Sequence, residues 1–547
     1  MKLTLDKFGG IVPRLAPHSL PVAAAEKAHN VKLRNGRIEP WRELCEFATA
    51  SGTASFHLRG CCVTSWDTVV NAAEVSPDWG RFYISGRNSY LESVTLSCKC
   101  DPSYYCLGVP APTNPPVATG TESCGRDTDA RSYVYTYINQ WYEESAPSPA
   151  SDIIRVADGS TVSVTGIELP PDGYGIIGAN LYRAVSGFRD VKGKQQAKVT
   201  EFLYVGTITF PSTSFNDNVL MANLGQALET EHTRMPPEGL QNVCSIESIV
   251  QLAATKKNRV YRSERFQPHN WPVKYELTLD STIVHMVENN GRLFVSTDTT
   301  PYVIDATNCD DTKCTPVTSL DAPLPDISCG HQGSAISTPY GMVYSSPLGV
   351  VLVSGDAKWH LLTKNWFSRD DWAKVAPETA RFGFYEGFLF IITDKISFIL
   401  DIDGEPYGDL KGTELTTISD SPVAMETSSA GQLMLLIDGK VWNWNGSDKF
   451  RKFLWESREL TLDGGGNNQP LASMWSPASV KIRSDDVRFT LISPVTGDAF
   501  TRKSLGERPF RVPRVGRHTH WFIRLEGKKP VDFVDIGTAT FTVNSGA

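Results

Sequence analysis

A short motif recurs four times near the middle of the chain, where a glycine is followed at once by an apolar run. The spacings between successive glycines are 50, 46 and 44 residues. A period of about 40–50 residues with several short strands per period is typical of a β-propeller. The glycine suits a turn, and the apolar run suits a strand buried on both faces. The four copies are Gly291-Arg292-Leu293-Phe294-Val295, Gly341-Met342-Val343-Tyr344, Gly387-Phe388-Leu389-Phe390-Ile391-Ile392 and Gly431-Gln432-Leu433-Met434-Leu435-Leu436.

The composition agrees with an all-β chain of more than one domain. The sequence has 547 residues, which exceeds one ordinary hydrophobic core, and its 34 prolines and 43 glycines suit many turns. The net charge of −8 argues against a general polyanion-binding protein. Residues 1–30 lack a charged head followed by an apolar core, and no apolar run is long enough to span a bilayer. We therefore expect synthesis in a cytosol and no stable membrane insertion.

Changes in proline content and in the pattern of predicted strands divide the chain into five segments. A run of four prolines, Pro110 to Pro116, indicates a stiff linker, and the strictly alternating stretch Tyr133 to Ile138 opens a region of about seven short strands. The fold class expected is an all-β propeller of about six blades with an inserted immunoglobulin- or fibronectin-like sandwich. The expected segments are an arm and hairpin (1–40), first propeller strands and linker (41–126), the inserted sandwich (127–225), propeller blades (226–460) and a C-terminal β segment that closes the propeller or forms a small sandwich (461–547).

Local signals within these segments give three further expectations. The dipeptide Asn35-Gly36 between alternating residues predicts a hairpin. Short helices are expected at 21–29, which is rich in alanine, and at 371–380.

Seven of the eleven cysteines form two clusters without a zinc-binding pattern. The clusters are Cys98, Cys100, Cys106 and Cys124, and Cys309, Cys314 and Cys329, with His331 as an extra candidate ligand. A zinc site usually needs paired Cys-x-x-Cys knuckles, which are lacking here. We favour reduced thiols over a metal site, and expect no metal and no cofactor.

Four groups of residues along the chain share one resemblance. They are Phe8-Gly9-Gly10, Pro13, Leu20-Pro21, Ala28, Asn30, Asn35-Gly36-Arg37 and Pro40; Tyr135-Thr136-Tyr137, Glu143 to Pro149 and Leu181-Tyr182-Arg183; Tyr261 to Glu264 and His269 to Pro272; and Arg511 to Arg514, Trp521-Phe522-Ile523 and Gly527. These stretches resemble the tail nozzle or hub proteins (tail tubular type) of short-tailed bacteriophages. The resemblance spans nearly the whole chain, and its motifs are structural rather than catalytic. The cysteine stretch between 98 and 124 is not part of that pattern.

This resemblance implies a structural virion protein that forms a ring, usually of six copies. Such a ring lies in the tail below the portal and adaptor proteins, next to tail fibre or tip proteins, and double-stranded DNA leaves through its channel without sequence-specific binding. The implied location is the virion tail, assembled in the host cytoplasm.

The residues give little support to an enzyme. A glycosidase needs two carboxylates flanking one bond, whereas the adjacent pairs Asp310-Asp311, Asp370-Asp371 and Asp485-Asp486 are more typical of solvated turns. His518 and His520 could share a strand face and bind a metal, but a surface role is favoured. Aromatic residues between 359 and 390 could form a sugar platform, but at blade positions we expect them in the core. No catalytic residue is assigned.

One segment carries a marked excess of basic residues. Between Thr501 and Pro530 nine basic residues face two glutamates, so this segment has a charge of +7 and the rest of the chain about −15. Such asymmetry suits head-to-tail packing of subunits, with DNA phosphate contact and a solvated hairpin as the alternatives. The interface candidates are Arg511, Arg514, Arg517, Lys528 and Lys529.

Two functions from different classes are therefore considered. The first is a non-enzymatic ring subunit of a phage tail nozzle or hub. The alternative is a carbohydrate-binding or glycoside-cleaving β-propeller at the tail tip.

Overall fold

The computed structural model shows a chain built almost entirely of antiparallel β-strands in small sheets. The residues that the structure describes are 2–123, 128–157, 159–186, 201–307, 312–317, 333–403, 414–461 and 474–538. The chain divides into two compact units. Unit 1 comprises Met1–Val70, Leu293–Ile304 and Cys314–Ala547, and unit 2 comprises Asn71–Arg292 and Asp305–Lys313.

Unit 2 contains two sheets of four strands that follow one another in chain order, as in propeller blades. Strand β19 packs against β8 and against β23 (Ile283–Asn289). Buried side chains of both sheets, including Tyr83, Leu252 and Trp271, share one hydrophobic cluster. The first sheet consists of β8 (Asn71–Ala73), β9 (Arg81–Ser85), β10 (Glu92–Leu96) and β11 (Pro102–Cys106), and the second of β19 (Gln241–Ile246), β20 (Gln251–Lys256), β21 (Arg259–Arg262) and β22 (Leu277–Thr278).

Unit 1 contains three further blade sheets, of which the third is completed by a strand from far away in the sequence. Strand β5 (Cys45–Thr49) pairs antiparallel with β37 and supplies the fourth strand. The sheets are β27 (Ala335–Thr338), β28 (Gly341–Ser346), β29 (Gly349–Val353) and β30 (Trp359–Leu361); β31 (Arg381–Tyr385), β32 (Phe388–Ile392), β33 (Ser397–Asp401) and β34 (Leu415–Ile418); and β35 (Ala424–Thr427), β36 (Leu433–Ile437) and β37 (Lys440–Asn443) with β5. The hairpin of β6 (Ser55–Arg59) and β7 (Cys62–Trp66) packs against β35.

The described residues hold one more run of four strands, so the number of runs agrees with the six blades predicted. This run consists of β23, β24 (Arg292–Thr297), β25 (Tyr302–Asp305) and β26 (Lys313–Pro316), and it divides between the two units. A β-propeller fold is thus the architecture of these segments. None of the helices in the described part is long and apolar enough to cross a membrane.

The four glycines of the sequence repeat occupy one position in these runs. Each has a positive φ, of 77° at Gly291, 134° at Gly341, 83° at Gly387 and 75° at Gly431. Each precedes or begins the second strand of its run, namely β24, β28, β32 and β36. The strand Phe388–Ile392 is buried along its whole length, as the repeat predicted.

Residues 117–217 of unit 2 form a β-sandwich of a three-stranded and a four-stranded sheet. Tyr133, Tyr135 and Tyr137 point into its core beside Val164 and Leu181. The alternation that was visible in the sequence therefore marks the inner face of β13. The sheets are β12 (Val117–Thr119), β15 (Val162–Thr165) and β18 (Phe215–Asp217), and β14 (Ile154–Ala157), β13 (Thr128–Asn139), β16 (Ile176–Ser186) and β17 (Leu203–Thr209).

A buried ionic cluster lies inside this sandwich. The Asp217 carboxylate accepts a hydrogen bond of 2.6 Å from Arg183 Nη1 and one of 2.8 Å from the Tyr133 hydroxyl. Arg131 Nη1 lies 3.9 Å from the same oxygen, and all three charged side chains are inaccessible to solvent. One carboxylate therefore compensates two buried guanidinium groups with the help of Asp129, which pairs with Arg131 at 3.3 Å.

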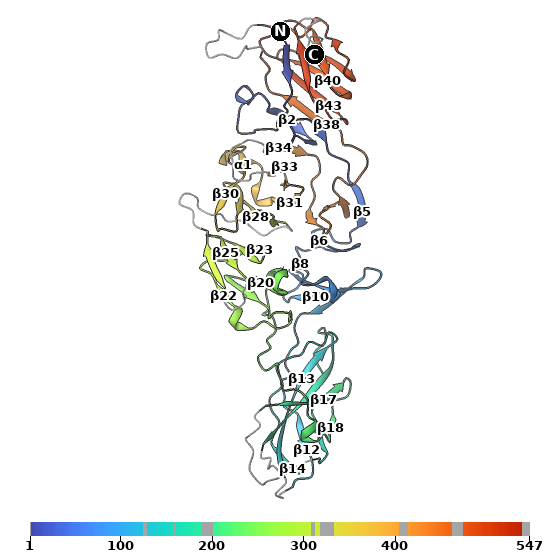
Figure 1. Ribbon diagram of the computed structural model, residues 1–547, viewed down its shortest axis with the longest axis vertical. Helices are drawn as coiled ribbons and strands as arrows, with labels where there is room; N and C mark the ends of the chain where they lie inside the picture. The colour runs from blue at the N-terminus through green and yellow to red at the C-terminus, as the bar shows by residue number, and fades with distance from the viewer. Residues whose placement is uncertain are drawn as a thin grey trace. The chain divides into compact units, whose positions relative to one another are not determined.

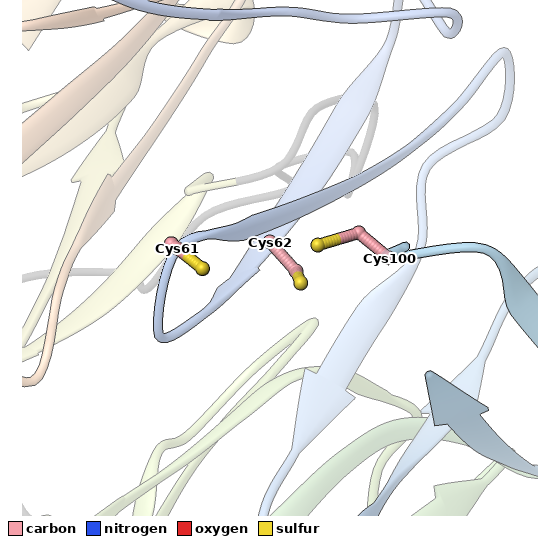
Figure 2. A group of neighbouring side chains, drawn as sticks. All are labelled: Cys61, Cys62 and Cys100. Atoms are coloured by element: carbon pink, nitrogen blue, oxygen red, sulfur yellow. The ribbon is translucent and has the colours of Figure 1, made fainter. Parts of the chain in front are cut away.

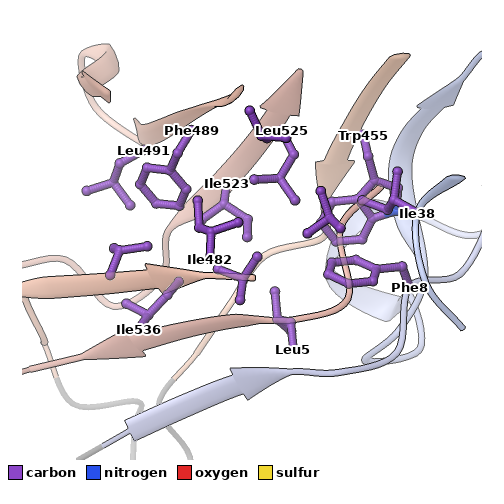
Figure 3. Close-up of a cluster of buried hydrophobic side chains, with 14 of the residues drawn as sticks. Leu5, Phe8, Ile38, Trp455, Ile482, Phe489, Leu491, Ile523, Leu525 and Ile536 are labelled. Atoms are coloured by element: carbon purple, nitrogen blue, oxygen red, sulfur yellow. The ribbon is translucent and has the colours of Figure 1, made fainter. Parts of the chain in front are cut away.

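A second sandwich in unit 1 brings together the two ends of the chain. In one sheet β1 (Lys2–Leu5) pairs with β44 (Val534–Gly537), followed by β39 (Ser479–Ile482) and β42 (Phe510–Arg511). The facing strands are β2 (Ala25–His29), β38 (Phe453–Ser457), β43 (Phe522–Gly527), β40 (Asp485–Ser493) and β41 (Gly497–Leu505). They continue the blade run β31–β34 beyond β34, so that both belong to one sheet of nine strands. Strands β38, β43 and β40 lie side by side in Figure 1. Figure 3 shows the core between the sheets, where Phe8 packs edge-on against Trp455 at 5.0 Å between ring centroids.

Of the short elements predicted from the sequence, the hairpin and one helix are confirmed and the other helix is wrong. The helix expected at 21–29 is wrong, because residues 25–29 form β2, which pairs with β38 and, in parallel, with β34. The hairpin at Asn35-Gly36 is confirmed by the pairing of β3 (Val31–Lys32) with β4 (Glu39–Pro40). The helix expected at 371–380 is present as α1 (Arg369–Lys374) and the short 3-10 helix η6 (Pro377–Thr379). Other single 3-10 turns are η1 (Pro17–Ser19), η2 (Pro77–Trp79), η3 (Met221–Asn223), η4 (Glu247–Ile249) and η5 (Val273–Tyr275).

The hairpin of β3 and β4 is fixed to a blade through Arg34. The Arg34 guanidinium forms two hydrogen bonds of 2.9 Å with the Asp401 carboxylate and lies 4.1 Å from the centroid of the Phe388 ring. It passes close to Gly387, where an added Cβ atom would lie 2.8 Å from Arg34 Nη2 and 2.6 Å from Asp403 Cβ. Glycine is thus required at position 387 for two reasons. The turn has a positive φ, and a Cβ atom there would collide with Arg34 and Asp403.

Gly387→Val should destabilise unit 1 more than Gly431→Val. Both substitutions place a β-branched residue at a positive φ, which costs about 1–3 kcal/mol, but a Cβ at Gly431 meets no atom within 4 Å. The extra loss at Gly387 comes from displacing Arg34. Thermal and urea unfolding of both variants measure the difference, and equal losses would show that clearance at Gly387 has no role.

Asp217→Ala should destabilise the inserted sandwich by about 3–5 kcal/mol, because it leaves buried arginines without their carboxylate. Asp152→Ala, at an exposed position of the same sandwich, is the matched control. Urea unfolding gives the free energy, and hydrogen exchange in β13 and β16 localises the loss. A loss below 1 kcal/mol would mean that Asp129 or water compensates the arginines.

Glu414 gives unit 1 a specific pH dependence. Burial, with a smaller contribution from the Asp401 charge, raises the pKa of Glu414 from about 4.5 to about 7, although its carboxylate accepts the backbone N–H of Gly10. The folded chain therefore holds a proton that the unfolded chain has already released between these two pH values. The contribution of Glu414 to stability should fall as the pH rises from about 4.5 to about 7.

Glu414→Gln should remove this dependence and make the protein more stable than the wild type at pH 8, by about 1–3 kcal/mol. A glutamine side chain can still accept from Gly10 N–H without carrying a charge. Melting temperatures between pH 5 and 8 measure the difference, with Glu122→Gln at an exposed position as the control. Parallel pH profiles for wild type and Glu414→Gln would contradict the assignment.

Candidate assembly surface

The five residues proposed for an interface all lie on the surface of the sandwich that joins the chain ends. Arg511 is the last residue of β42, and Arg514 and Arg517 follow it. Lys528 and Lys529 follow β43, and all five side chains are exposed. The structure thus places them in two stretches of one domain, one that begins at the end of β42 and one that follows β43.

The segment that carries the three arginines is fixed to the sandwich at both ends. Val512 N–H donates to the Ala478 carbonyl at 2.8 Å. At the other end, His518 and Trp475 exchange backbone hydrogen bonds of 3.0 and 2.9 Å. Because the backbone between these points is anchored, the arginine side chains project from a defined surface.

Of the five candidate residues, only Lys528 forms an ion pair within the described residues. Lys528 pairs with Glu43 at 3.0 Å, whereas Arg511, Arg514, Arg517 and Lys529 form no ion pair within the described residues. Glu507, one of the two acids of the segment, pairs with Arg483 at 3.0 Å instead. The positive charge of the three arginines is therefore not compensated by the described part of the chain.

A structural role for this charge must be weighed as well. Strand β42 forms the edge of the sheet β1-β44-β39-β42. Basic side chains on an edge strand discourage pairing with other chains, so Arg511 could act in protection alone. Edge protection does not account for Arg514 and Arg517, which lie outside the strand.

The acidic pairs that sequence analysis considered for catalysis have structural partners. Ser368 caps α1, since its Oγ accepts from Asp371 N–H at 3.2 Å and donates to Asp371 Oδ2 at 2.6 Å. Lys374 pairs with Asp371 at 2.9 Å, and Lys503 pairs with Asp486. The pair at 310–311 lies outside the described residues. Asp370 and Asp371 lie in the first turn of α1, and Asp485 and Asp486 lie at the exposed start of β40, so these two pairs are not in the turns that the sequence predicted.

The structure also shows the surroundings of the aromatic residues of 359–390 and of the two histidines, His518 and His520. Trp366, Phe367, Trp372 and Phe382 are buried in one hydrophobic core and Phe388 and Phe390 in another, which confirms their core assignment. The His518 ring packs edge-on against Trp521 at 4.8 Å, and the His520 ring against Phe522 at 5.8 Å.

The cysteines present both free and bonded sulfur atoms. Cys98 and Cys106 carry free thiols, as expected, but Cys100 is disulfide-bonded, whereas we expected a reduced thiol there. Figure 2 shows Cys61 and Cys62 at the tight connection from β6 to β7. Cys124, Cys309, Cys329 and His331 lie outside the described residues.

Comparison with known proteins adds little beyond the architecture. No family model and no curated protein matches the sequence. Similar solved structures include the WD40 domain of Neurospora crassa Pan2, with 8% identity, a TM-score of 0.31 and coverage of 75% of this chain and 97% of that one. Another is the β-propeller domain of Myceliophteria thermophila Cps50 (Swd1), with 9% identity, a TM-score of 0.25 and coverage of 55% and 80%. Likenesses this weak carry no argument on function.

Proposed function

We propose that this chain is a structural subunit of the tail of a short-tailed bacteriophage, a nozzle or hub protein without catalytic activity. Copies would assemble head to tail into a ring, with six as the expected number, and double-stranded DNA would pass through its channel. The neighbours would be adaptor or portal-side proteins and tail fibre or tip proteins. The ring would be assembled in the host cytoplasm and remain in the virion tail, and no cofactor is needed.

The uncompensated arginine segment is the observation that carries this proposal. Arg511, Arg514 and Arg517 are exposed and anchored, and they lack an acidic partner in the described residues. The remainder of the chain carries an excess of acid. In a heterologous ring the same basic surface of each copy meets a different, acidic surface of the next, so both charges are satisfied at every contact.

The positions of the residues that resemble the phage family support the same proposal, because these residues lie in the cores of the fold. Phe8 and Trp521 are buried in the core of the sandwich that joins the chain ends, and Tyr135 is buried in the inserted sandwich. Each of these residues stabilises the core of its own sandwich. The resemblance therefore concerns how the chain is built and agrees with a scaffold more than with a reaction.

An arginine-lined channel would fit this proposal poorly. Each DNA phosphate that binds an arginine releases counterions and strengthens binding, so such a channel would retain the genome it has to release. We therefore place the arginine segment at a subunit contact and expect the channel wall to be acidic on balance.

Reversing Arg511, Arg514 and Arg517 to glutamate together should weaken ring assembly or docking and make it more sensitive to salt. Negative-stain images and light scattering of the purified chain at several salt concentrations measure assembly. The matched control reverses Lys99, Arg155 and Lys257, which are exposed, make no ion pair in the described residues and give the same change of charge.

Normal assembly of the triple variant combined with altered DNA retention would place the segment in the channel. Monomers of the wild-type chain at every concentration, with no ring in virion tails, would contradict the ring itself.

A further inference from the structure

A hollow of about 490 Å³ opens on the surface of unit 2 between four segments. Trp79 and Arg81 come from the first blade and residues 141–144 from the turn after β13. Thr230 adds a single side chain, and Phe266, Gln267 and His269 come from the loop after β21. Its size is within the range of about 300–1,000 Å³ of small-molecule sites. Aromatic and charged side chains dominate its wall.

A buried charged cluster forms one wall of this hollow. Arg81 is 5% exposed and pairs with Glu143, and His269 Nδ1 lies 3.5 Å from the same carboxylate oxygen of Glu143. The Arg81 guanidinium also lies 4.6 Å from the centroid of the Trp141 ring. The wall thus places a buried guanidinium group beside an indole.

Two aromatic side chains at the rim of the first hollow are exposed to solvent instead of packed in a core. Tyr142 is 80% exposed and Phe266 is 65% exposed, and both line the hollow. Both also have a positive φ, of 61° and 56°, a region that side chains of this size rarely adopt. Exposure and backbone strain at the same residues are typical of binding sites.

A second hollow of about 280 Å³ shares Tyr142 with the first. It lies over the sandwich sheet and is lined by Ile177, Asn180 and Thr207 among others. Thr207 Oγ1 donates to Asn180 Oδ1 at 2.7 Å, and Asn180 Nδ2 donates to Glu144 Oε1 at 3.3 Å. Because Glu144 also lines the first hollow, a chain of polar groups runs from one hollow to the other.

We propose that these two hollows form a binding groove for an extended neutral oligosaccharide, with Tyr142 between two sugar subsites. Amide, hydroxyl, carboxylate and guanidinium groups together match the paired donors and acceptors of sugar hydroxyls. Exposed rings match the apolar faces of pyranoses. Glu143 compensates Arg81, and Glu144 adds a further negative charge, so the groove disfavours acidic polysaccharides and nucleic acid.

The charged cluster keeps Glu143 in its ionised form. Despite its burial, hydrogen bonds from His269 and Arg81 lower the pKa of Glu143 to about 2. Glu143 therefore remains ionised at physiological pH and cannot itself be a general acid in glycoside hydrolysis. This inference does not depend on the ring proposal, because both hollows lie within unit 2 of one chain.

The test uses the full-length wild-type chain on a microarray of bacterial surface polysaccharides and neutral oligosaccharides. We expect binding to neutral glycans, with longer oligosaccharides preferred over single sugars because two subsites are available. Tyr142→Gly should reduce binding at least tenfold without lowering the melting temperature, because glycine tolerates the positive φ at this position. Tyr142→Phe, which keeps the ring, should retain binding.

Tyr90→Ala is the matched control, since Tyr90 is a partly exposed aromatic residue of unit 2 that lines neither hollow. It should bind as the wild type does. The proposal is overturned if no glycan binds, if only acidic glycans bind, or if Tyr142→Gly binds as well as the wild type.

Discussion

Unit 1 depends on backbone pairing between strands at opposite ends of the sequence. Strand β1 pairs with β44, β2 lies between β34 and β38, and β5 completes the sheet of β35–β37. An unpaired edge leaves a row of backbone N–H and C=O groups open to other chains. These three pairings cover such edges in both the blades and the sandwich, and the cores behind them form only when they are made.

Features that repeat or alternate locally could be predicted from the sequence. The blade strands and their four glycines were visible because each blade repeats one local pattern of turn and apolar run. The inner face of β13 was visible because side chains alternate along a strand. The arginine segment was visible as a run of charge, although its lack of internal partners required the structure.

Features made by distant segments could not be predicted. Residues 21–29 look helical by their alanines, yet Ala25 and Ala28 are small residues buried where β2 crosses the sandwich core. Arg34 fits beside Gly387 only once the hairpin lies on the blade. The groove around Tyr142 combines side chains from several segments that are far apart in the sequence. Its only signal in the sequence was the adjacent aromatic pair Trp141-Tyr142 next to two glutamates.

The pairing of β5 with β37 also implies a delay during synthesis between the appearance of β5 and that of its partner strand. Thr49 pairs with Lys440, so a ribosome making about 5–20 residues per second needs roughly 20–80 seconds after Thr49 to reach its partner. During that time β5 has no native neighbour on that side and is open to pairing with other nascent chains. Completion of this blade therefore waits until Lys440 has been made, and chaperones that shield extended segments would matter most for this stretch of the chain.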